Sequence, residues 1–439
     1  MGKRLVPFVG GLRMKFEDYQ PYLSPALAKA TDLIAISGKG CYLTDSKGDR
    51  YLDFVQGIAV NALGHCHPKV VEAIKTQAGK LITASFNVVN YPTTLELAKR
   101  LAEVTPGELN SVFFSNGGAE AIDGALKLAK AYTKRPAIIA FQGSFHGRSF
   151  GALSVTGSNA YYRKYYEPMV GSVYFTAYPS TDLCPKGFNE EQRTEYCLNE
   201  LDRLFQNLVA PDQVAAIIME PVQGEGGYVV PSKAFVQEIR ERCDQYGILL
   251  IMDEIQSGYG RTGKMFASEH FDVVPDIMTV GKAIAGGLPM SAVISTQVIM
   301  AEWRSGMHGT TFGGNPICAA AALAVLDEFK QSCLLEHVNE EGAYLRNRLV
   351  RLQKKYSCIS DVRGLGLMLA IEFSHPDGSP AGDLLEAVRA ACLKNRLLTL
   401  SCGVHHNGMR FATPLNVTND EIDQGIAIIE SVLDQLYAQ

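Results

Sequence analysis

Seven short apolar runs between residues 76 and 325 constrain the fold of this chain more than any other feature. The segments between them show helical periodicity; after Ala119, apolar side chains follow at spacings of three and four residues. Runs that are apolar almost throughout are typical of strands covered on both faces. The alternation predicts an α/β fold with a mostly parallel, helix-covered sheet. The predicted strands are 111–115, 137–141, 171–175, 214–219, 248–252, 276–280 and 291–296.

The two ends of the chain predict a second, smaller unit. Residues 40–54 hold two short β runs around a turn at 46–49, which is a hairpin pattern. Beyond residue 325 the helices become longer and the strands fewer. The elements expected there are strands at 362–364 and 366–373, a helix at 383–396, and a final helix that begins with a capping box at 418–421. We therefore predict a large domain at 76–325 and a small α+β domain made of 1–75 and 326–439.

Composition disfavours several classes of protein. The chain carries 41 basic and 46 acidic side chains, a net charge of −5, which argues against nucleic acid or an anionic membrane as the main partner. No apolar run reaches the length of a membrane span, and the residues after Met1 lack the apolar region of a secretory leader. The ten cysteines are scattered and form no C-x-x-C pair, which is typical of a reducing compartment. We expect a cytoplasmic protein.

The triplet His65-Cys66-His67 is the one feature that suggests a metal site. Alternating ligands on a short loop do not complete a tetrahedral site, and no fourth ligand is spaced nearby. We therefore predict a structural turn before Pro68 and no metal.

Ligands of open α/β sheets bind beyond the carboxyl ends of the strands, so the segments that follow the predicted strands are informative. Gly117 and Gly118 follow the first strand and precede a helix, a pattern that fits either a phosphate cradle or a tight turn. The second strand is followed by Phe145, His146 and Arg148. These side chains suit ring stacking, proton transfer and carboxylate binding, although packing in the core and solvation explain them better when this segment is taken alone.

Three further strand ends carry charge. Glu220 and Glu225 lie in a glycine-rich loop, Asp253 follows five apolar residues, and Lys282 stands among small and apolar neighbours. Asp253 suits a protonated ring nitrogen or a structural ion pair, and Lys282 suits an imine-forming amine or a lysine whose stem alone is buried. Five strand ends of this kind at one edge of a sheet indicate a site rather than five unrelated structural details.

With these motifs the chain resembles the class III pyridoxal-phosphate aminotransferases of fold type I, the group of 4-aminobutyrate, ornithine and acetylornithine aminotransferases. The resemblance covers about residues 35–430. Its most specific part runs from 251–258 to 281–287, and 144–148, 220–227 and 309–316 are similar to other landmarks of the family. It implies a seven-stranded sheet and pyridoxal 5'-phosphate as the cofactor.

The resemblance also implies roles for single residues. Lys282 holds the cofactor as a Schiff base and moves the proton, and Asp253 pairs with the pyridine nitrogen. Further cofactor contacts are implied for Gly118, Ala119, Phe145, Gln256 and, reaching the phosphate of the neighbouring subunit, Thr311. That last contact implies a homodimer with active sites at the interface, or a tetramer of such dimers. Many members have Ser or Thr where this chain has Gly117, so one hydroxyl contact to the phosphate is missing.

The substrate site is implied in the same way. Arg148 and Arg410 bind substrate carboxylates, and Glu225 pairs with Arg410 while the amino donor is bound. Ile58, in place of a tyrosine, offers no hydroxyl to a second amine and disfavours ornithine, and residues 161–174 resemble the aminobutyrate branch. We expect ping-pong transfer from an ω-amino acid, 4-aminobutyrate first, to 2-oxoglutarate. The alternatives are acetylornithine, ornithine or lysine aminotransferase, and an amino-acid racemase or epimerase; a non-catalytic binding protein is disfavoured by Lys282 and Asp253.

Overall fold

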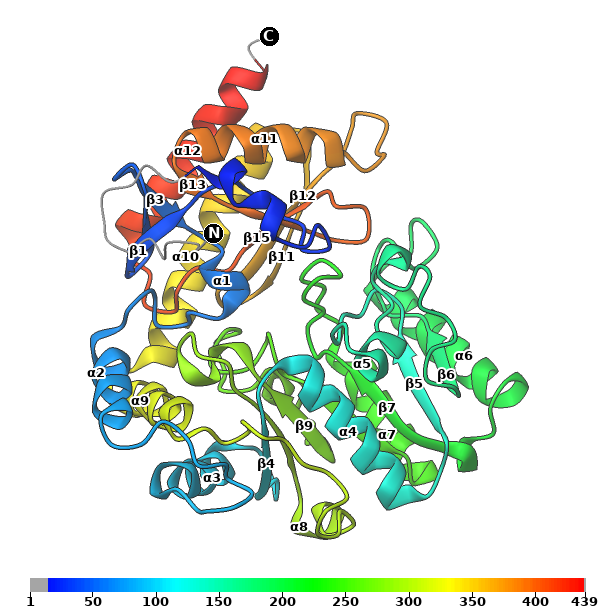
Figure 1. Ribbon diagram of the computed structural model, residues 1–439. Helices are drawn as coiled ribbons and strands as arrows, with labels where there is room; N and C mark the ends of the chain where they lie inside the picture. The colour runs from blue at the N-terminus through cyan, green and yellow to red at the C-terminus, as the bar shows by residue number, and fades with distance from the viewer. Residues whose placement is uncertain (1–14, 438–439) are drawn as a thin grey trace.

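The computed structural model describes residues 15–437 (Figure 1). The expectation about a leader at Met1 and the first fourteen residues of the predicted segment 1–75 lie outside the described residues. None of the helices within 15–437 combines the length and the apolar character that crossing a membrane requires.

A seven-stranded sheet in the order β4-β10-β9-β8-β7-β5-β6 forms the centre of the larger part of the molecule. Strand β10 runs antiparallel to both of its neighbours, and the other pairs are parallel. The predicted α/β sheet is confirmed, because each apolar run forms one strand with bounds close to those expected. The strands are β4 (Ser111–Ser115), β5 (Ala137–Phe141), β6 (Val173–Thr176), β7 (Val214–Met219), β8 (Leu249–Asp253), β9 (Ile277–Val280) and β10 (Ser291–Ser295).

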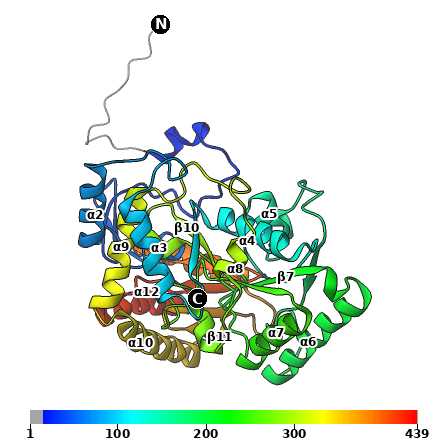
Figure 2. The same cartoon turned by 90° about the horizontal axis from the view of Figure 1, so that it is seen from below.

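Helices cover both faces of this sheet (Figure 2). Helices α4 (Gly118–Thr133) and α5 (Phe150–Ser154) lie on one face, and α6 (Glu190–Asn207) and α7 (Lys233–Tyr246) lie on the other. Separate apolar clusters fill the two layers. Strands β5, β7 and β8 are buried along their whole length, which explains why their sequences are apolar at every position rather than at alternate ones.

N-terminal and C-terminal segments of the described chain meet in a second region (Figure 1). Strand β13 (Leu397–Leu398) pairs in parallel with β3 (Arg50–Asp53), so a C-terminal strand joins the sheet of the N-terminal hairpin. The predicted hairpin is present, since β3 also pairs with β2 (Tyr42–Asp45), next to β1 (Ala35–Lys39). A third sheet has the order β11-β12-β15-β14, with strands β11 (Ile359–Leu365), β12 (Met368–Phe373), β14 (Leu400–Cys402) and β15 (Gly408–Phe411).

Helices α10 (Leu334–Lys355), α11 (Gly382–Lys394) and α12 (Asn419–Tyr437) complete this region. The predicted capping box is present, because Thr418 and Glu421 exchange side chain to backbone hydrogen bonds. The division of the chain at residues 75 and 325 stays a prediction. The remaining elements are α1 (Gln56–Ala59), α2 (Pro68–Ala78), α3 (Pro92–Val104), α8 (Gln297–Met300) and α9 (Pro316–Gln331), with 3-10 turns at Phe16–Asp18, Gln20–Tyr22, Ala160–Tyr162, Pro211–Gln213, Ala267–Phe271 and Lys282–Ala285.

Candidate active site

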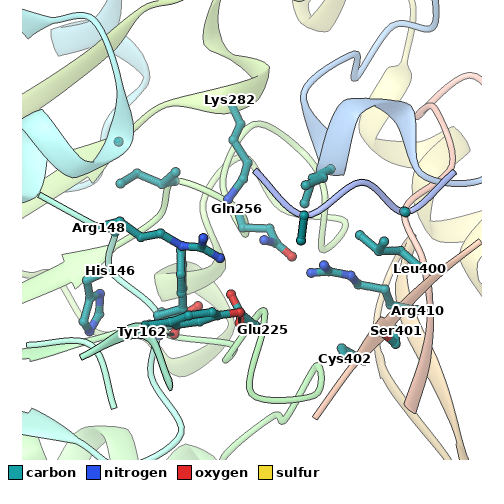
Figure 3. Close-up of a pocket in the computed structure, with 18 of the residues that line it drawn as sticks. His146, Arg148, Tyr162, Glu225, Gln256, Lys282, Leu400, Ser401, Cys402 and Arg410 are labelled. Atoms are coloured by element: carbon teal, nitrogen blue, oxygen red, sulfur yellow. Dashed lines mark hydrogen bonds between the residues drawn. The ribbon is translucent and has the colours of Figure 1, made fainter. Parts of the chain in front are cut away.

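A cavity of about 650 Å³ lies where the carboxyl ends of β5, β7, β8 and β9 face β14 and β15 (Figure 3). It stands at the sheet edge where the sequence predicts ligand binding. All the predicted site residues except Thr311 line it, namely Ile58, Gly118, Ala119, Phe145, Arg148, Glu225, Asp253, Gln256, Lys282 and Arg410.

Lys282 follows β9 and points its amine into the cavity (Figure 3). Its backbone is left-handed, with φ of 44°, which is uncommon for a residue other than glycine and typical of strained functional positions. Burial lowers the pKa of the Lys282 amine, and Asp253 and Glu220 partly oppose this effect. A lysine with a lowered pKa is more often neutral, and a neutral amine is the form that acts as a nucleophile and takes up a proton.

Asp253 ends β8 and is almost completely buried. Its Oδ2 lies 2.7 Å from Nδ1 of His146, and its Oδ1 accepts hydrogen bonds from the backbone N–H of Ile255 at 3.0 Å and from the Thr279 hydroxyl at 3.3 Å. These contacts fix the carboxylate at the wall of the cavity. The sequence indicated only that His146 could titrate, whereas the structure places it behind Asp253 as a support.

The N-terminus of α4 forms another wall through Gly118 and Ala119. Within the described part of the chain, no side chain caps this helix, so the N–H groups of its first turn remain available to an anion. A Cβ atom at Gly117 would meet nothing within 4 Å. The missing hydroxyl at this position is therefore not a consequence of crowding.

Two further side chains suit a flat ring. Gln256 lines the cavity, and its Oε1 is buried without a hydrogen-bond partner among residues 15–437. The ring of Phe145 packs edge to face against Tyr162, with ring centroids 6.0 Å apart. The backbone N–H of Phe145 donates to Glu220 at 2.9 Å. A buried carboxylate, a buried amine, an uncapped helix N-terminus and an aromatic wall fit the ring nitrogen, aldehyde, phosphate and ring face of pyridoxal 5'-phosphate.

Two arginines reach into the cavity from different sides (Figure 3). The guanidinium of Arg148 stacks 4.1 Å from the centre of the Tyr162 ring. Arg410 lies on β15, is 8% exposed, and has an Nε without a partner in the described structure. Neither arginine has a carboxylate of residues 15–437 within 4 Å. Arg410 is a buried cation without a counter-ion, which is costly, so its side of the cavity favours a ligand that carries a carboxylate. Arg148 is exposed in this structure, and its guanidinium is free to meet a carboxylate that enters from solvent.

Glu225 lies in the loop after β7, and its Oε1 accepts a hydrogen bond from the Tyr162 hydroxyl at 2.6 Å. Its pairing with Arg410 stays a prediction, because in this structure the carboxylate faces Tyr162. Sequence reasoning missed Tyr162 as a site residue, although it lies in the tyrosine-rich stretch used to compare branches of the family. It also left open the role of Glu220, a buried carboxylate that accepts the N–H groups of Phe145 and Gly224.

Ile58 lines the cavity from a turn with unusual backbone angles. All four residues of α1 have positive φ, which costs residues other than glycine roughly 1–2 kcal/mol each. Asp53 stabilises the turn by accepting the N–H groups of Val55 and Gln56, and its Oδ2 lies 2.8 Å from His65. His65 thus takes part in a structural contact that supports this turn. Thr311 is exposed in the loop before α9.

Together the fold and the cavity define a pyridoxal-phosphate-dependent transferase. Residues 25–433 match the model of the class III aminotransferases. The chain belongs to the class III aminotransferases, and it is a pyridoxal-phosphate-dependent aminotransferase.

Several known proteins are similar over nearly the whole chain. The probable 4-aminobutyrate aminotransferase of Bacillus subtilis is 39% identical over 94% of this chain and 95% of its own length. The acetylornithine aminotransferase of Caldanaerobacter subterraneus is 40% identical, over 92% and 95%. Among solved structures, an (S)-enantioselective omega-transaminase from Thermomicrobium roseum superimposes with a TM-score of 0.89 at 31% identity, covering 96% of this chain and 97% of that one. A PLP-bound amine transaminase from an uncultivated Pseudomonas species gives 0.87 at 30% identity, over 94% and 98%.

Proposed function

We propose that the enzyme transfers the amino group of an ω-amino acid, 4-aminobutyrate first, to 2-oxoglutarate by a ping-pong mechanism. The observation that carries this proposal is the pair of arginines without carboxylate partners, Arg148 and Arg410, that reach toward Lys282 from different sides of one cavity. 2-Oxoglutarate has a carboxylate at each end and its carbonyl near one of them, so two separated cations suit it. A donor such as 4-aminobutyrate has a single carboxylate and needs one of them.

The choice of donor rests on Ile58 in the wall of the cavity. Ile58 is apolar and gives no hydrogen-bond partner to a second amine, which favours 4-aminobutyrate over ornithine. A relative of similar identity is named an acetylornithine aminotransferase, so acetylornithine is the second candidate donor. Its acylated side-chain amine carries no charge, and an apolar wall accepts it more readily than the free amine of ornithine.

The cofactor contacts are proposed as the sequence predicts them. When bound, pyridoxal 5'-phosphate supplies an aldehyde that accepts the amino group and a ring that withdraws electrons from the reacting carbon. Nζ of Lys282 takes up and returns the proton at that carbon, and Asp253 keeps a proton on the ring nitrogen. The remaining contacts are those of Phe145 and Gln256 with the ring, and those of Gly118 and Ala119 with the phosphate.

Glu225 and Arg410 are proposed to control which acid enters. With a monocarboxylate donor, Glu225 neutralises Arg410, which then has no unpaired charge beside an apolar substrate chain. With 2-oxoglutarate, Glu225 moves away and Arg410 binds the second carboxylate. One cavity thus accepts two acids of different charge by changing the partner of a single arginine.

We also propose a cytoplasmic homodimer in which Thr311 reaches the phosphate site of the neighbouring subunit. Exposed apolar side chains near Thr311 support an interface: Ile82, Val88, Val89, Met307 and Phe312. These side chains belong to two segments, 82–89 and 307–312. A side-chain amide joins the segments, because Asn87 donates a hydrogen bond to the carbonyl of Thr310 at 2.8 Å. Apolar side chains gathered on a surface are typical of a subunit contact.

The test is the formation of glutamate from 2-oxoglutarate with 4-aminobutyrate, ornithine, acetylornithine, lysine and β-alanine as donors. We expect the highest kcat/KM with 4-aminobutyrate. A higher value with acetylornithine would assign the enzyme to the second candidate. Turnover of an amino acid without any 2-oxoglutarate would overturn the proposal in favour of a racemase.

A further inference from the structure

Tyr162 contacts three of the residues assigned to the substrate and cofactor site. Its hydroxyl donates to Glu225 at 2.6 Å, its ring face carries the guanidinium of Arg148 at 4.1 Å, and its ring packs against Phe145 with centroids 6.0 Å apart (Figure 3). It lies in the 3-10 turn Ala160–Tyr162, outside the sheet that supplies the other groups. One side chain from this turn therefore joins the ring-stacking wall, one carboxylate-binding arginine and the glutamate of the proposed switch.

We propose that Tyr162 is the second partner of Glu225 and sets the specificity for the amino acceptor. Glu225 alternates between two positions: on Arg410, which closes the site to a second carboxylate, and on the Tyr162 hydroxyl, which leaves Arg410 open to 2-oxoglutarate. The structure shows the open position. This inference rests on the proposed function, because it names the group that holds Glu225 while the acceptor binds.

The backbone around Glu225 limits the motion to the side chain. Its carbonyl accepts the N–H of Gly403 at 2.8 Å, which ties the loop to the end of β14. On either side, Gln223 and Val229 exchange two backbone hydrogen bonds and close the loop. A loop held at these points does not carry Glu225 between two places as a unit. Rotation about its side-chain bonds remains, and that motion is fast compared with turnover.

Arg410 is equally fixed at its backbone, since β15 pairs with β12 on one side and β14 on the other. Its side chain is buried beside Tyr228, and its Nε has no partner in residues 15–437. A carboxylate that leaves Arg410 needs a donor at the other position, or it is left desolvated without a hydrogen bond. The Tyr162 hydroxyl is that donor.

The ionisation of Tyr162 suits this role. Burial and the neighbouring Glu225 raise the pKa of the Tyr162 phenol to about 12, while Arg148 lowers it in part. The hydroxyl therefore keeps its proton near neutral pH, and it donates to Glu225 when the carboxylate is within reach. Stacking on Arg148 fixes the plane of the ring, and so the direction of the hydroxyl.

The test is Tyr162→Phe, which removes the hydroxyl and keeps the ring that carries Arg148. The two half-reactions are measured separately, by the absorbance of the bound cofactor, with 4-aminobutyrate alone and then with 2-oxoglutarate alone. We expect KM for 2-oxoglutarate to rise on the order of tenfold, from loss of a hydrogen bond to a charged group, with the donor half-reaction unchanged. In calorimetric titration of Tyr162→Phe with glutarate, an unreactive dicarboxylate, we expect the Kd to rise by the same factor.

Tyr161→Phe is the matched control, because Tyr161 is the adjacent tyrosine and its side chain is 75% exposed. It should leave both half-reactions and glutarate binding unchanged. In a Glu225→Gln background, Tyr162→Phe should have no further effect on glutarate binding, because the group that the hydroxyl holds has lost its charge. A melting temperature equal to that of the wild type shows that Tyr162→Phe folds normally.

Two results would overturn the inference: equal losses in the two half-reactions, or no change in glutarate affinity in Tyr162→Phe. Failure of the proposed function looks different. In that case the wild type itself does not form glutamate from 2-oxoglutarate, whichever variant is compared with it. If another donor replaces 4-aminobutyrate, the glutarate titration still tests Tyr162, because it contains no donor.

Discussion

His146 and Asp253 form a buried pair at the wall of the active-site cavity, with Nδ1 2.7 Å from Oδ2. The imidazole holds the carboxylate from behind, in the place where we propose that it meets the ring nitrogen of the cofactor. We predict that His146→Ala lowers kcat by about 10–100-fold, the usual range for loss of a support behind a functional group. Steady-state kinetics and the cofactor absorbance measure the effect. His375→Ala, on the surface beside Asp383, is the control and should keep full activity.

Lys282 has a more direct role. We predict that purified wild type absorbs visible light after addition of pyridoxal 5'-phosphate and that Lys282→Ala does not. Activity should fall by at least about 10²–10⁴-fold, because the group that moves the proton is lost. A colourless wild type would contradict the assignment of this lysine, whatever the variant does.

Gly117 is a position where a substitution is expected to tighten cofactor binding. A Cβ at this position meets no atom within 4 Å, and its φ of −136° suits any residue. We predict that Gly117→Ser adds a hydroxyl contact to the phosphate and tightens cofactor binding up to about tenfold. Gly118→Ser is the contrast, because its Cβ would lie 3.0 Å from the side chain of Ile255. It should weaken binding. Titration of the apoenzyme with cofactor separates the two outcomes.

Glu220 makes stability depend on pH. Burial raises the pKa of this carboxyl from 4.5 to about 7, with His146 lowering it and Asp253 raising it further. The folded chain therefore keeps a proton that the unfolded chain releases above pH 4.5. The stability from this group is full below pH 4.5 and is lost as the pH rises through about 7.

Glu220→Gln mimics the protonated side chain and removes this loss. We predict that the difference in free energy of unfolding between pH 5 and pH 8 changes by roughly 3 kcal/mol between wild type and variant, with the variant favoured at pH 8. Urea unfolding at the two pH values measures it. An equal change in the free energy of unfolding between pH 5 and pH 8 in the two proteins would show that the Glu220 carboxyl titrates at its ordinary pKa.

The sequence predicts the large sheet well, because each strand buried on both faces leaves a continuous apolar run. It does not predict the direction of β10, since burial leaves the same pattern whichever way a strand runs. The pairing of β13 with β3 is also beyond it, because Leu397 and Leu398 are too short a run to stand out from their surroundings.

The site divides in the same way. Lys282, Asp253 and the glycines before α4 stand directly after strands, so the order of the sheet gathers them at one edge. The contact between Tyr162 and Glu225 joins two loops, and it depends on how each loop folds rather than on any spacing. The positive φ of Ile58 likewise occurs in a turn whose preceding N–H groups, those of Val55 and Gln56, bond to Asp53, and no local pattern of residues reveals it.

The parallel pairing of β3 with β13 has a consequence for synthesis of the chain. Leu52 is made before every strand of the seven-stranded sheet, and its partner Leu397 only after all of them. The N-terminal hairpin therefore waits with one edge unpaired while the large sheet is already able to form. Arg410, the residue proposed to bind the second carboxylate, follows Leu397 and so is also made after the whole large sheet. A nascent chain that ends before Arg410 already contains Lys282 but lacks the arginine on which the proposed discrimination between the two acids depends.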